Sequence, residues 1–230
     1  MVAILRKIFY KVVAMNPYLD RAIRYRNPQE YWRARGGEGY FHEQEAVHDR
    51  TLRSQFIAKE VRGLKFSSLL EVGCGYGKQL KNLLGSEVSL TGCDFSHTQL
   101  EKAKEYCPEM AARLAEADAE AIPFRDKSFD AVLTSAVILH NKQEKAQKII
   151  AELIRVCRRY LIHNEDTDIT FSRYGYDLSE TYRQMNFKIV ASKQIPSAPD
   201  PSITQFTIAE IPPGAARVKP EDIPLAYYKR

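Results

Sequence analysis

Short apolar segments alternate with longer amphipathic segments from residue 43 to residue 211. A short apolar run is typical of a buried strand, whereas apolar positions at helical spacing are typical of a surface helix. In residues 142–157, for example, Ile149, Ile150 and Leu153 share one helical face. The pattern predicts strands at residues 67–70, 88–93, 113–117, 129–137 and 159–163, and helices at residues 43–61, 78–84, 96–106, 142–157 and 176–185.

This alternation predicts an α/β fold, with a Rossmann-like, mostly parallel sheet covered by helices. Two further strands, residues 187–194 and 203–211, are joined by a proline-rich connection. Because a parallel neighbour needs a long crossover, these two strands predict an antiparallel hairpin at the C-terminal end of the sheet. Ser96 and Gln99 have the spacing of a capping box, which predicts that the Ser96 side chain caps the helix after it.

The turn after the first strand is rich in glycine. Residues 71–77 read EVGCGYG and lead directly into a helix. Glycines let the backbone approach a ligand closely, and the helix N-terminus offers free N–H groups. Asp94 ends the second strand, so we expect its carboxylate beside this turn, where it can accept both hydroxyls of a ribose. The dinucleotide motif G-x-G-x-x-G differs, because its third glycine position is Lys78 here.

An acidic residue two positions before G-x-G-x-G resembles the first motif of class I S-adenosylmethionine (SAM)-dependent methyltransferases. Three further matches follow: Asp94 after the second strand, Asp118-Ala119 after the third, and residues 129–133 (FDAVL) opening the fourth. The resemblance covers roughly residues 60–212 and is closest to the group acting on small molecules. It implies a seven-stranded sheet that binds SAM at the carboxyl ends of its strands, beside strand one.

The resemblance also implies roles for individual residues. The glycines line the methionine portion of SAM, Glu71 orients their loop, and Asp94 holds the ribose hydroxyls. Phe95 is expected against the adenine ring, and Asp118 is expected to accept from the adenine amino group; a solvated loop carboxylate is the alternative for Asp118. The expected cofactor-binding residues are Glu71, Gly73, Gly75, Gly77, Asp94, Phe95, Asp118, Ala119 and Ser135.

The acceptor side is harder to assign from the sequence. Methyl transfer from a sulfonium is an in-line displacement, so an enzyme mainly brings the acceptor and the methyl group together. A hydroxyl acceptor also needs a base, and histidine suits that task near neutral pH. His140 follows the fourth predicted strand and His163 is the last residue of the fifth, so we expect both at the ligand edge of the sheet. Both histidines are candidate bases. The alternative for each is a loop residue whose ring makes hydrogen bonds within the protein and has no catalytic role. Some members of the family use no base.

Aromatic residues surround the Gly36-Gly37 joint ahead of the first strand. They fit equally well a lid that shuts water out of the site and simple packing on the domain. After the fifth predicted strand, an arginine lies near two tyrosines, which suits an anionic or hydroxylated substrate. The expected lid and substrate residues are Tyr31, Trp32, Arg35, Tyr40, Arg173, Tyr174 and Tyr176.

A chain of 230 residues is long enough for one substantial domain with extensions. We expect an N-terminal arm or lid at residues 1–42, a methyltransferase domain at residues 43–212, and a proline-rich tail at residues 213–230 that runs over the surface. The composition is ordinary for a soluble globular enzyme, with 44% hydrophobic and 27% charged residues. The four cysteines are scattered and lack zinc-site spacing, so we expect structural thiols in a reducing cytoplasm and no metal site.

The net charge of +5 is concentrated at the N-terminus. Residues 1–35 contain eight basic and two acidic residues, a local charge of +6. Residues 4–13 place apolar side chains on one helical face, with Arg6, Lys7 and Lys11 around the rest. This arm is expected to pack on the domain, to contact an anionic membrane surface through residues 1–26, or to bind RNA. The oligomeric state stays open.

Together these patterns predict a SAM-dependent methyltransferase that acts on a small molecule, with oxygen as the favoured acceptor atom. Two alternatives stay open, namely an RNA methyltransferase that uses the basic arm and a SAM-binding protein without catalytic activity. Residues 134–137 read TSAV and lack the Asn/Asp-Pro-Pro-aromatic signature of many base N-methyltransferases. Nucleic acid is therefore not the expected partner.

Overall fold

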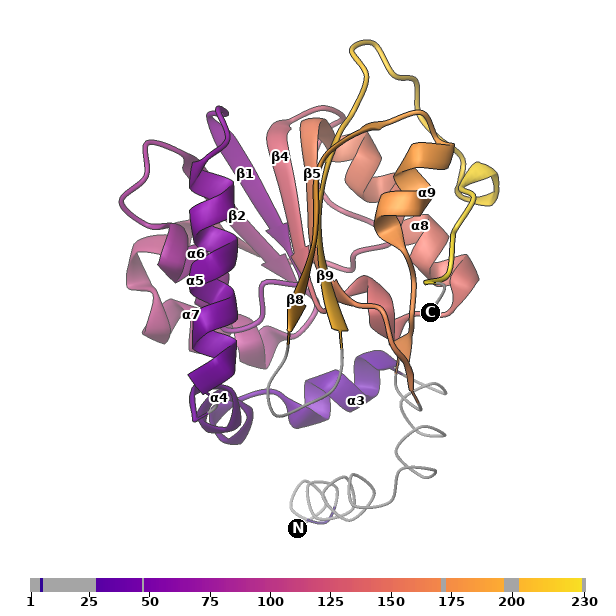
Figure 1. Ribbon diagram of the computed structural model, residues 1–230. Coiled ribbons are helices and arrows are strands. Elements are labelled where there is room, and N and C mark those ends of the chain that lie inside the picture. Colours follow the sequence, from indigo (N-terminus) through magenta and orange to yellow (C-terminus); the bar gives the residue numbers. More distant parts are fainter. Residues whose placement is uncertain (1–4, 6–27, 47, 171–172, 197–202, 229–230) are drawn as a thin grey trace.

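A computed structural model describes residues 28–46, 48–170, 173–196 and 203–228 of the chain, together with Leu5. These residues form one large sheet with helices on both faces (Figure 1). Residues 1–26 of the predicted arm lie outside the described residues, apart from Leu5. No helix in the described ranges has both the length and the apolar character needed to cross a membrane.

The large sheet has seven strands, in the order β3-β2-β1-β4-β5-β9-β8. The strands are β1 (Ser68–Val72), β2 (Ser89–Asp94), β3 (Leu114–Glu116), β4 (Phe129–Ser135), β5 (Cys157–Asp166), β8 (Lys188–Pro196) and β9 (Ile203–Glu210). Neighbours from β3 to β5 are parallel, whereas β9 pairs antiparallel with both β5 and β8. The predicted α/β class, with a mostly parallel sheet and a C-terminal antiparallel hairpin, is confirmed.

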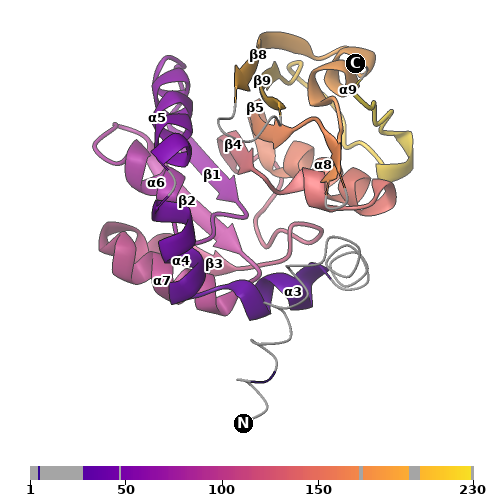
Figure 2. The ribbon, with the colours of Figure 1, turned by 60° about the horizontal axis from the view of Figure 1, so that its bottom comes forward.

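Helices cover both faces of the sheet (Figure 2). They are α5 (His48–Arg62), α6 (Lys78–Leu83), α7 (His97–Tyr106), α8 (Gln143–Val156) and α9 (Leu178–Gln184), with short 3-10 helices η1 (Pro108–Arg113), η2 (Ile138–His140) and η3 (Pro220–Asp222). Successive strand residues face opposite sides of a sheet, which separates two apolar cores. Leu69 of β1 packs in the core with α5, α6 and α7, whereas Leu70 packs in the core with α8 and α9.

Two further helices lie at the carboxyl ends of the parallel strands (Figures 1 and 2). They are α3 (Pro28–Arg35) and α4 (Glu38–Glu45), and the Gly36-Gly37 joint separates them as predicted. Gly37 has a φ of 100°, which favours glycine and allows the sharp change of direction. A small two-stranded sheet, β6 (Ile169–Thr170) with β7 (Arg173–Tyr174), follows β5.

Two local predictions were wrong. The fifth strand was predicted to end at His163, but antiparallel pairing with β9 extends β5 as far as Asp166. Ser96 does begin α7, but its side chain makes no capping hydrogen bond. The Ser96 N–H group instead donates to Asp94 Oδ1 at 2.8 Å, so the start of α7 is tied to the end of β2.

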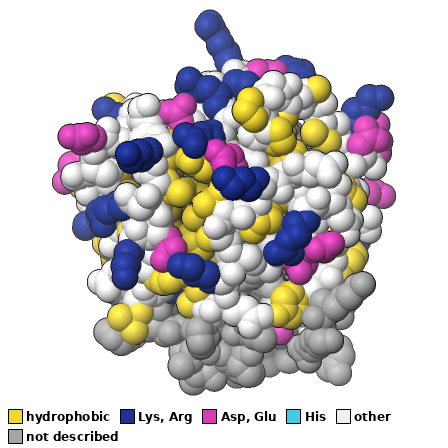
Figure 3. Space-filling model, turned by 45° about the horizontal axis from the view of Figure 1, so that its top comes forward, with side chains coloured by type: hydrophobic (Ala, Val, Ile, Leu, Met, Phe, Trp, Pro, Cys, Tyr) yellow, Lys and Arg dark blue, Asp and Glu magenta, His cyan; other side chains and the backbone are white. Residues whose placement is uncertain are grey.

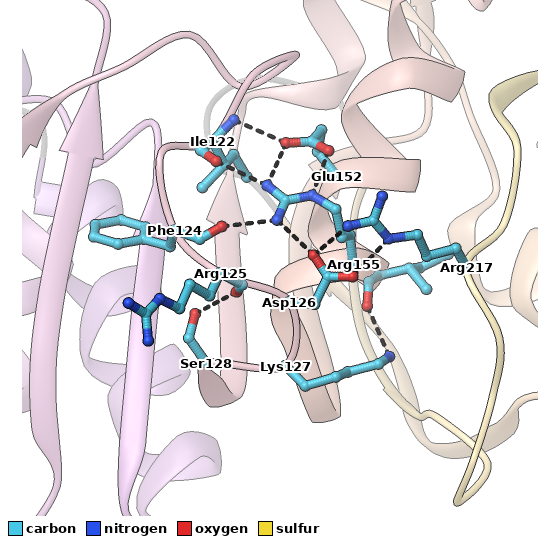
Figure 4. Close-up of polar contacts among 10 residues, drawn as sticks. Ile122, Phe124, Arg125, Asp126, Lys127, Ser128, Glu152, Arg155 and Arg217 are labelled. Atoms are coloured by element: carbon cyan, nitrogen blue, oxygen red, sulfur yellow. Dashed lines mark hydrogen bonds and ion pairs between the residues drawn. The ribbon is translucent and has the colours of Figure 1, made fainter.

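The tail was predicted to run over the surface, but part of it enters the core. Ile223 and Leu225 are buried in the core with α8, and the Gln147 side chain donates to the Ile223 carbonyl at 2.8 Å. Arg217 pairs with Asp126 at 2.6 Å, and Asp126 also accepts from Arg155 of α8 at 3.1 Å (Figure 4). Apolar burial and this ion-pair network therefore hold the tail against the domain.

The edge of the sheet opposite α3 and α4 belongs to a face of mixed charge. Lys and Arg side chains lie on this face with Asp, Glu and apolar side chains among them (Figure 3). At the start of β5, Arg158 pairs with Asp130 at 3.4 Å, and Arg159 pairs with Glu210 at 2.8 Å. Because these cations have acidic partners, the opposite edge is not a surface of a single charge.

Candidate active site

A cavity of about 440 Å³ lies at the carboxyl ends of the parallel strands. The chain reverses its direction of travel across the sheet between β1 and β4, and a doubly wound sheet binds ligands at such a point. Most of the predicted site residues meet in this one space. Those that line it are Trp32, Tyr40, Glu71, Gly73, Gly75, Asp94, Phe95, Asp118, Ala119, Ser135, His140 and Arg173.

The glycine turn adopts a backbone conformation that other residues rarely take. Gly73, Gly75 and Gly77 have φ values of 72°, 53° and 84°. A side chain at Gly73 would also collide with a γ-carbon of Val137, in the loop after β4. Gly77 caps the N-terminus of α6 and is not among the residues that line the cavity. The turn therefore needs glycine both for its conformation and for close packing against the neighbouring loop.

The Asp94 carboxylate lies beside the glycine turn, as the sequence predicts. Its Oδ2 atom accepts from the Gly75 N–H group at 2.9 Å, while Oδ1 accepts from the Ser96 N–H group. Burial raises the pKa of Asp94, and these two hydrogen bonds oppose that shift. Each carboxylate oxygen has a second lone pair, so Asp94 can accept from ligand hydroxyls while it holds the turn.

Glu71 offers the cavity a buried acceptor atom. The residue is 2% exposed, and its Oε2 atom has no hydrogen-bond partner among the described residues. Burial and, to a lesser degree, the nearby Asp94 charge raise the pKa of Glu71 well above its usual value. A buried acceptor of this kind is costly until a donor reaches it. The amino group of SAM is such a donor, so Glu71, Asp94 and the glycine turn together fit SAM.

An aromatic ring and a carboxylate form the wall beyond Asp94. Phe95 and Asp118 both line the cavity there, and Arg33 of α3 lies 5.8 Å from the Phe95 ring centroid. Asp118 Oδ1 accepts from the Glu120 N–H group at 3.2 Å, which orients the carboxylate. A flat aromatic face with a nearby acceptor suits adenine and its amino group.

The aromatic residues of α3 and α4 divide between two roles. Trp32 lines the cavity, with its ring 5.7 Å from Tyr40 and 5.3 Å from His140 between centroids. Tyr31 is instead 1% exposed and packs inside the protein. Trp32 and Tyr40 therefore form part of the wall, whereas Tyr31 anchors α3. The Arg35 side chain lies outside the described part of the chain.

Glu45 connects α4 to the glycine turn. Its carboxylate accepts from the Tyr76 hydroxyl at 2.8 Å and pairs with the Lys78 ammonium at 2.9 Å. Tyr76 belongs to the glycine turn, and Lys78 is the first residue of α6. An ion pair and a hydrogen bond therefore fix α4 to the glycine turn and to the start of α6.

The two histidine candidates occupy different environments. His140 lines the cavity, whereas His163 is fully buried and is not among the lining residues. The His163 ring lies between Thr134 Oγ1, 2.8 Å from Nδ1, and the Tyr182 hydroxyl, 2.8 Å from Nε2. Burial lowers the pKa of His163 to about 3, so the ring stays neutral. This geometry favours His140 over His163 as the residue that faces an acceptor.

Glu165 holds the loop that leads to His140. Glu165 Oε2 accepts from the Val137 and Leu139 N–H groups at 3.1 and 3.2 Å, and Oε1 accepts from Thr134 Oγ1 at 2.9 Å. Burial raises the pKa of Glu165 to about 7, although the hydrogen bonds oppose this shift. No sequence motif indicated this role, because it depends on the pairing of β4 with β5.

The two tyrosines after β5 support the wall of the cavity. Neither Tyr174 nor Tyr176 is among the lining residues, whereas Arg173 is. The two tyrosine rings stack with centroids 5.9 Å apart, and the Tyr176 hydroxyl donates to the Asn141 carbonyl at 2.8 Å. Tyr176 thereby holds the backbone next to His140. The sequence predicted a substrate contact for both tyrosines, whereas the structure places them outside the lining of the cavity.

The cavity also contains residues that the sequence did not mark. Arg53 of α5 and Asp166 at the end of β5 both line it. The direction of Arg53 depends on how α5 packs on the sheet, which no local motif reveals. In the described ranges, no group of three or more His, Cys, Asp or Glu residues is placed to hold a metal ion. All four cysteines are free and buried.

Residues 69–160 match a family model described as a methyltransferase domain. A phosphatidylethanolamine N-methyltransferase of Cereibacter sphaeroides is 37% identical over 95 residues, which cover 40% of this chain and 45% of that protein. A probable tRNA methyltransferase 9B of Homo sapiens is 34% identical over 104 residues, which cover 44% of this chain and 21% of that protein. The matches thus span less than half the length of either relative.

Among solved structures, the chain resembles phosphoethanolamine N-methyltransferase 1 of Haemonchus contortus, determined in complex with phosphoethanolamine and S-adenosylhomocysteine. The TM-score is 0.65 at 14% sequence identity, and the match covers 90% of this chain and 52% of that chain. At this level of identity, the likeness shows that the two chains share a fold.

Proposed function

We propose that this chain is a class I SAM-dependent methyltransferase, and that it transfers a methyl group to an oxygen atom of a small-molecule acceptor. The observation that carries the proposal is the cavity that His140 lines together with eight of the nine expected cofactor residues, all but Gly77. Glu71, Asp94 and the glycine turn would hold SAM, which supplies an activated methyl group on a sulfonium when bound. The cavity volume of about 440 Å³ is that of a small-molecule site.

The residues of this chain then have three tasks. His140 takes the proton of the acceptor hydroxyl, and a positioned base of this kind typically contributes about 10²–10⁴ in rate. Trp32 and Tyr40 cover the acceptor end of the cavity and exclude water. Glu165 keeps the loop before His140 in place, so the base and the acceptor meet in a fixed geometry.

Transfer of a labelled methyl group from SAM tests this proposal. We expect the purified protein to transfer the label to a component of a small-molecule extract. The labelled product should be a methyl ether or a methyl ester. Label that appears only in the RNA fraction would replace the proposal with RNA methylation. Binding of S-adenosylhomocysteine without any transfer would support a non-catalytic binding protein.

RNA methylation is the second candidate. It is favoured by the similarity to tRNA methyltransferase 9B and by the charge of +6 in residues 1–35. The lining of the cavity argues against RNA, because two of its lysines pair with acidic side chains. Lys78 pairs with Glu45 at 2.9 Å, and Lys145 pairs with Glu120 at 2.8 Å. An RNA substrate predicts a mobility shift that weakens steeply with salt, and a small-molecule acceptor predicts none.

Membrane contact through residues 1–26 stays a prediction, since this segment lies outside the described residues. Deleting residues 1–16 is expected to abolish sedimentation with anionic vesicles if the arm binds a membrane. Lower thermal stability or lower activity after the deletion would instead support packing of the arm on the domain.

A further inference from the structure

The turn that follows β3 forms part of the cavity wall through Asp118. A hydrogen bond from the Ala121 N–H group to the Asp118 carbonyl closes this turn at 3.0 Å. Just before it, the Ala117 N–H group donates to the Asp94 carbonyl at 3.0 Å, which fixes the start of the turn to the end of β2. The chain then leaves the sheet until β4 begins, so the far end of the turn needs anchors outside the sheet.

Helix α8 supplies these anchors. Glu152 Oε2 accepts from the Ile122 N–H group at 2.9 Å. Arg155 Nη2 donates to the Ile122 carbonyl at 2.8 Å, and Arg155 Nη1 donates to the Phe124 carbonyl at 2.7 Å (Figure 4). Two side chains one helical turn apart therefore bind both backbone polar groups of Ile122, the residue that directly follows the turn.

Every donor of the Arg155 guanidinium group takes part in this network. Its Nε and Nη2 atoms donate to the two oxygens of Glu152 at 2.6 and 2.7 Å, and Nη1 also donates to Asp126 at 3.1 Å. With the two carbonyls, these bonds use all five N–H groups of the arginine. The Arg155 and Glu152 side chains are only 15% and 21% exposed. A planar, partly buried fork of this kind holds its partners in one geometry.

The same face of α8 reaches the cavity. Lys145 and Ile149 line the cavity, and Glu152 and Arg155 follow them at helical spacing. Lys145 also pairs with Glu120, inside the turn, at 2.8 Å. One face of α8 therefore lines the cavity at its N-terminal end and holds the turn along the rest of its length.

We propose that Glu152 and Arg155 are positioning residues for the cofactor, and that they hold the turn so that Asp118 meets the adenine amino group. The inference rests on the proposed function, because it assumes that SAM fills the cavity with its adenine against this wall. A positioning role has a specific consequence. Loss of the Glu152–Arg155 pair should weaken recognition of the amino group more than recognition of the rest of the cofactor.

Calorimetry with two ligands measures this difference. S-adenosylhomocysteine carries the amino group, whereas S-inosylhomocysteine has a carbonyl oxygen in its place. We expect the wild type to bind S-adenosylhomocysteine about tenfold more tightly, because a carbonyl oxygen facing Asp118 replaces a charge-assisted hydrogen bond. Asp118→Ala should abolish this preference, and it provides the reference for complete loss.

Arg155→Gln should reduce the preference to less than about threefold, because a hydrogen bond weakens steeply once its geometry is lost. Glu152→Gln keeps an acceptor for the Ile122 N–H group and breaks one of the two bonds to Arg155, so it should reduce the preference with less damage to the fold. Adding Arg155→Gln to Asp118→Ala should weaken S-adenosylhomocysteine binding little further, since the pair acts through Asp118.

Arg158→Gln is the matched control. Arg158 also donates to a carbonyl of the connection between β3 and β4, that of Ser128 at 3.0 Å, and it also pairs with an aspartate, Asp130. Its side chain is 52% exposed and contacts the end of the connection that is remote from the turn. The control should therefore show the preference of the wild type.

An unchanged preference in Arg155→Gln and Glu152→Gln would overturn the inference, even if both variants melted earlier, because the network would then only stabilise the fold. Equal binding of the two ligands by the wild type would also overturn it. If the wild type bound neither ligand, the proposed function itself would fail. The two failures are therefore distinguishable.

Discussion

Replacing Glu165 by Gln tests how the loop before His140 is held. Protonated Glu165 can donate from Oε1 to Thr134 Oγ1 and still accept from the Val137 and Leu139 N–H groups through Oε2. A glutamine side chain reproduces this arrangement, with its amide nitrogen in the place of Oε1. Glu165→Gln therefore mimics the protonated form at every pH. We expect it to remove the cost of ionising a fully buried carboxyl group.

The magnitude follows from the pKa of Glu165, which burial raises from 4.5 to about 7. One pKa unit corresponds to about 1.4 kcal/mol, so ionisation of Glu165 costs the folded state about 3 kcal/mol. Between these pH values the folded state binds more protons than the unfolded state. The free energy of unfolding therefore falls as the pH rises from 4.5 to about 7, as far as Glu165 determines it.

His163 acts in the opposite direction. Its pKa is lowered from 6.5 to about 3, so between these pH values His163 is protonated in the unfolded state and neutral in the folded state. The free energy of unfolding therefore rises with pH between about 3 and 6.5, as far as His163 determines it. The wild type and Glu165→Gln share His163, so only the difference between the two proteins isolates the contribution of Glu165.

Urea unfolding of both proteins at pH 5 and pH 8 measures this difference. We expect an advantage for Glu165→Gln of less than about 1 kcal/mol at pH 5 and of about 3 kcal/mol at pH 8. Glu210 is the control, because Arg159 lowers its pKa and Glu210→Gln should therefore gain no stability at pH 8. A Glu165→Gln protein that is less stable than the wild type at pH 8 would refute the reasoning, since the carboxylate would then be the form that the loop needs.

Three further substitutions test the site. Asp94→Ala should weaken S-adenosylhomocysteine binding by about 2–4 kcal/mol in calorimetry, because charge-assisted hydrogen bonds are lost; an unchanged dissociation constant would exclude the ribose contact. His140→Ala should lower turnover about a hundredfold without weakening the cofactor, whereas the exposed His97→Ala should change neither; full activity of His140→Ala would mean that positioning alone suffices. Gly73→Ala should lower thermal stability and cofactor affinity together, since its Cβ meets Val137; retention of both would show that the turn adapts.

The central sheet could be predicted from the sequence because its strands are short apolar runs separated by helical patterns. The glycine turn and Asp94 were also predictable, since the chemistry of nucleotide binding requires glycine and a carboxylate at fixed places along a βαβ unit. Strand ends were less predictable: β5 continues to Asp166 because β9 pairs with it, and β9 begins 37 residues after β5 ends.

The acceptor end shows where local patterns stop being informative. His140 follows β4 and His163 belongs to β5, and both strands end at the cavity. His163 is nevertheless buried against Tyr182, which depends on how α9 packs on the sheet and not on a local pattern. Arg53 belongs to a helix with no motif, and it reaches the cavity only because of how α5 crosses the sheet. Residues brought together by tertiary packing therefore had to be read from the structure.

The most direct test of the central claim is calorimetric titration of the purified chain with S-adenosylhomocysteine and, in parallel, with NAD. The G-x-G-x-G turn, the unsatisfied Glu71 Oε2 atom and the Asp94 carboxylate predict saturable one-to-one binding of S-adenosylhomocysteine and no binding of NAD. Binding of NAD in preference to S-adenosylhomocysteine would contradict the account.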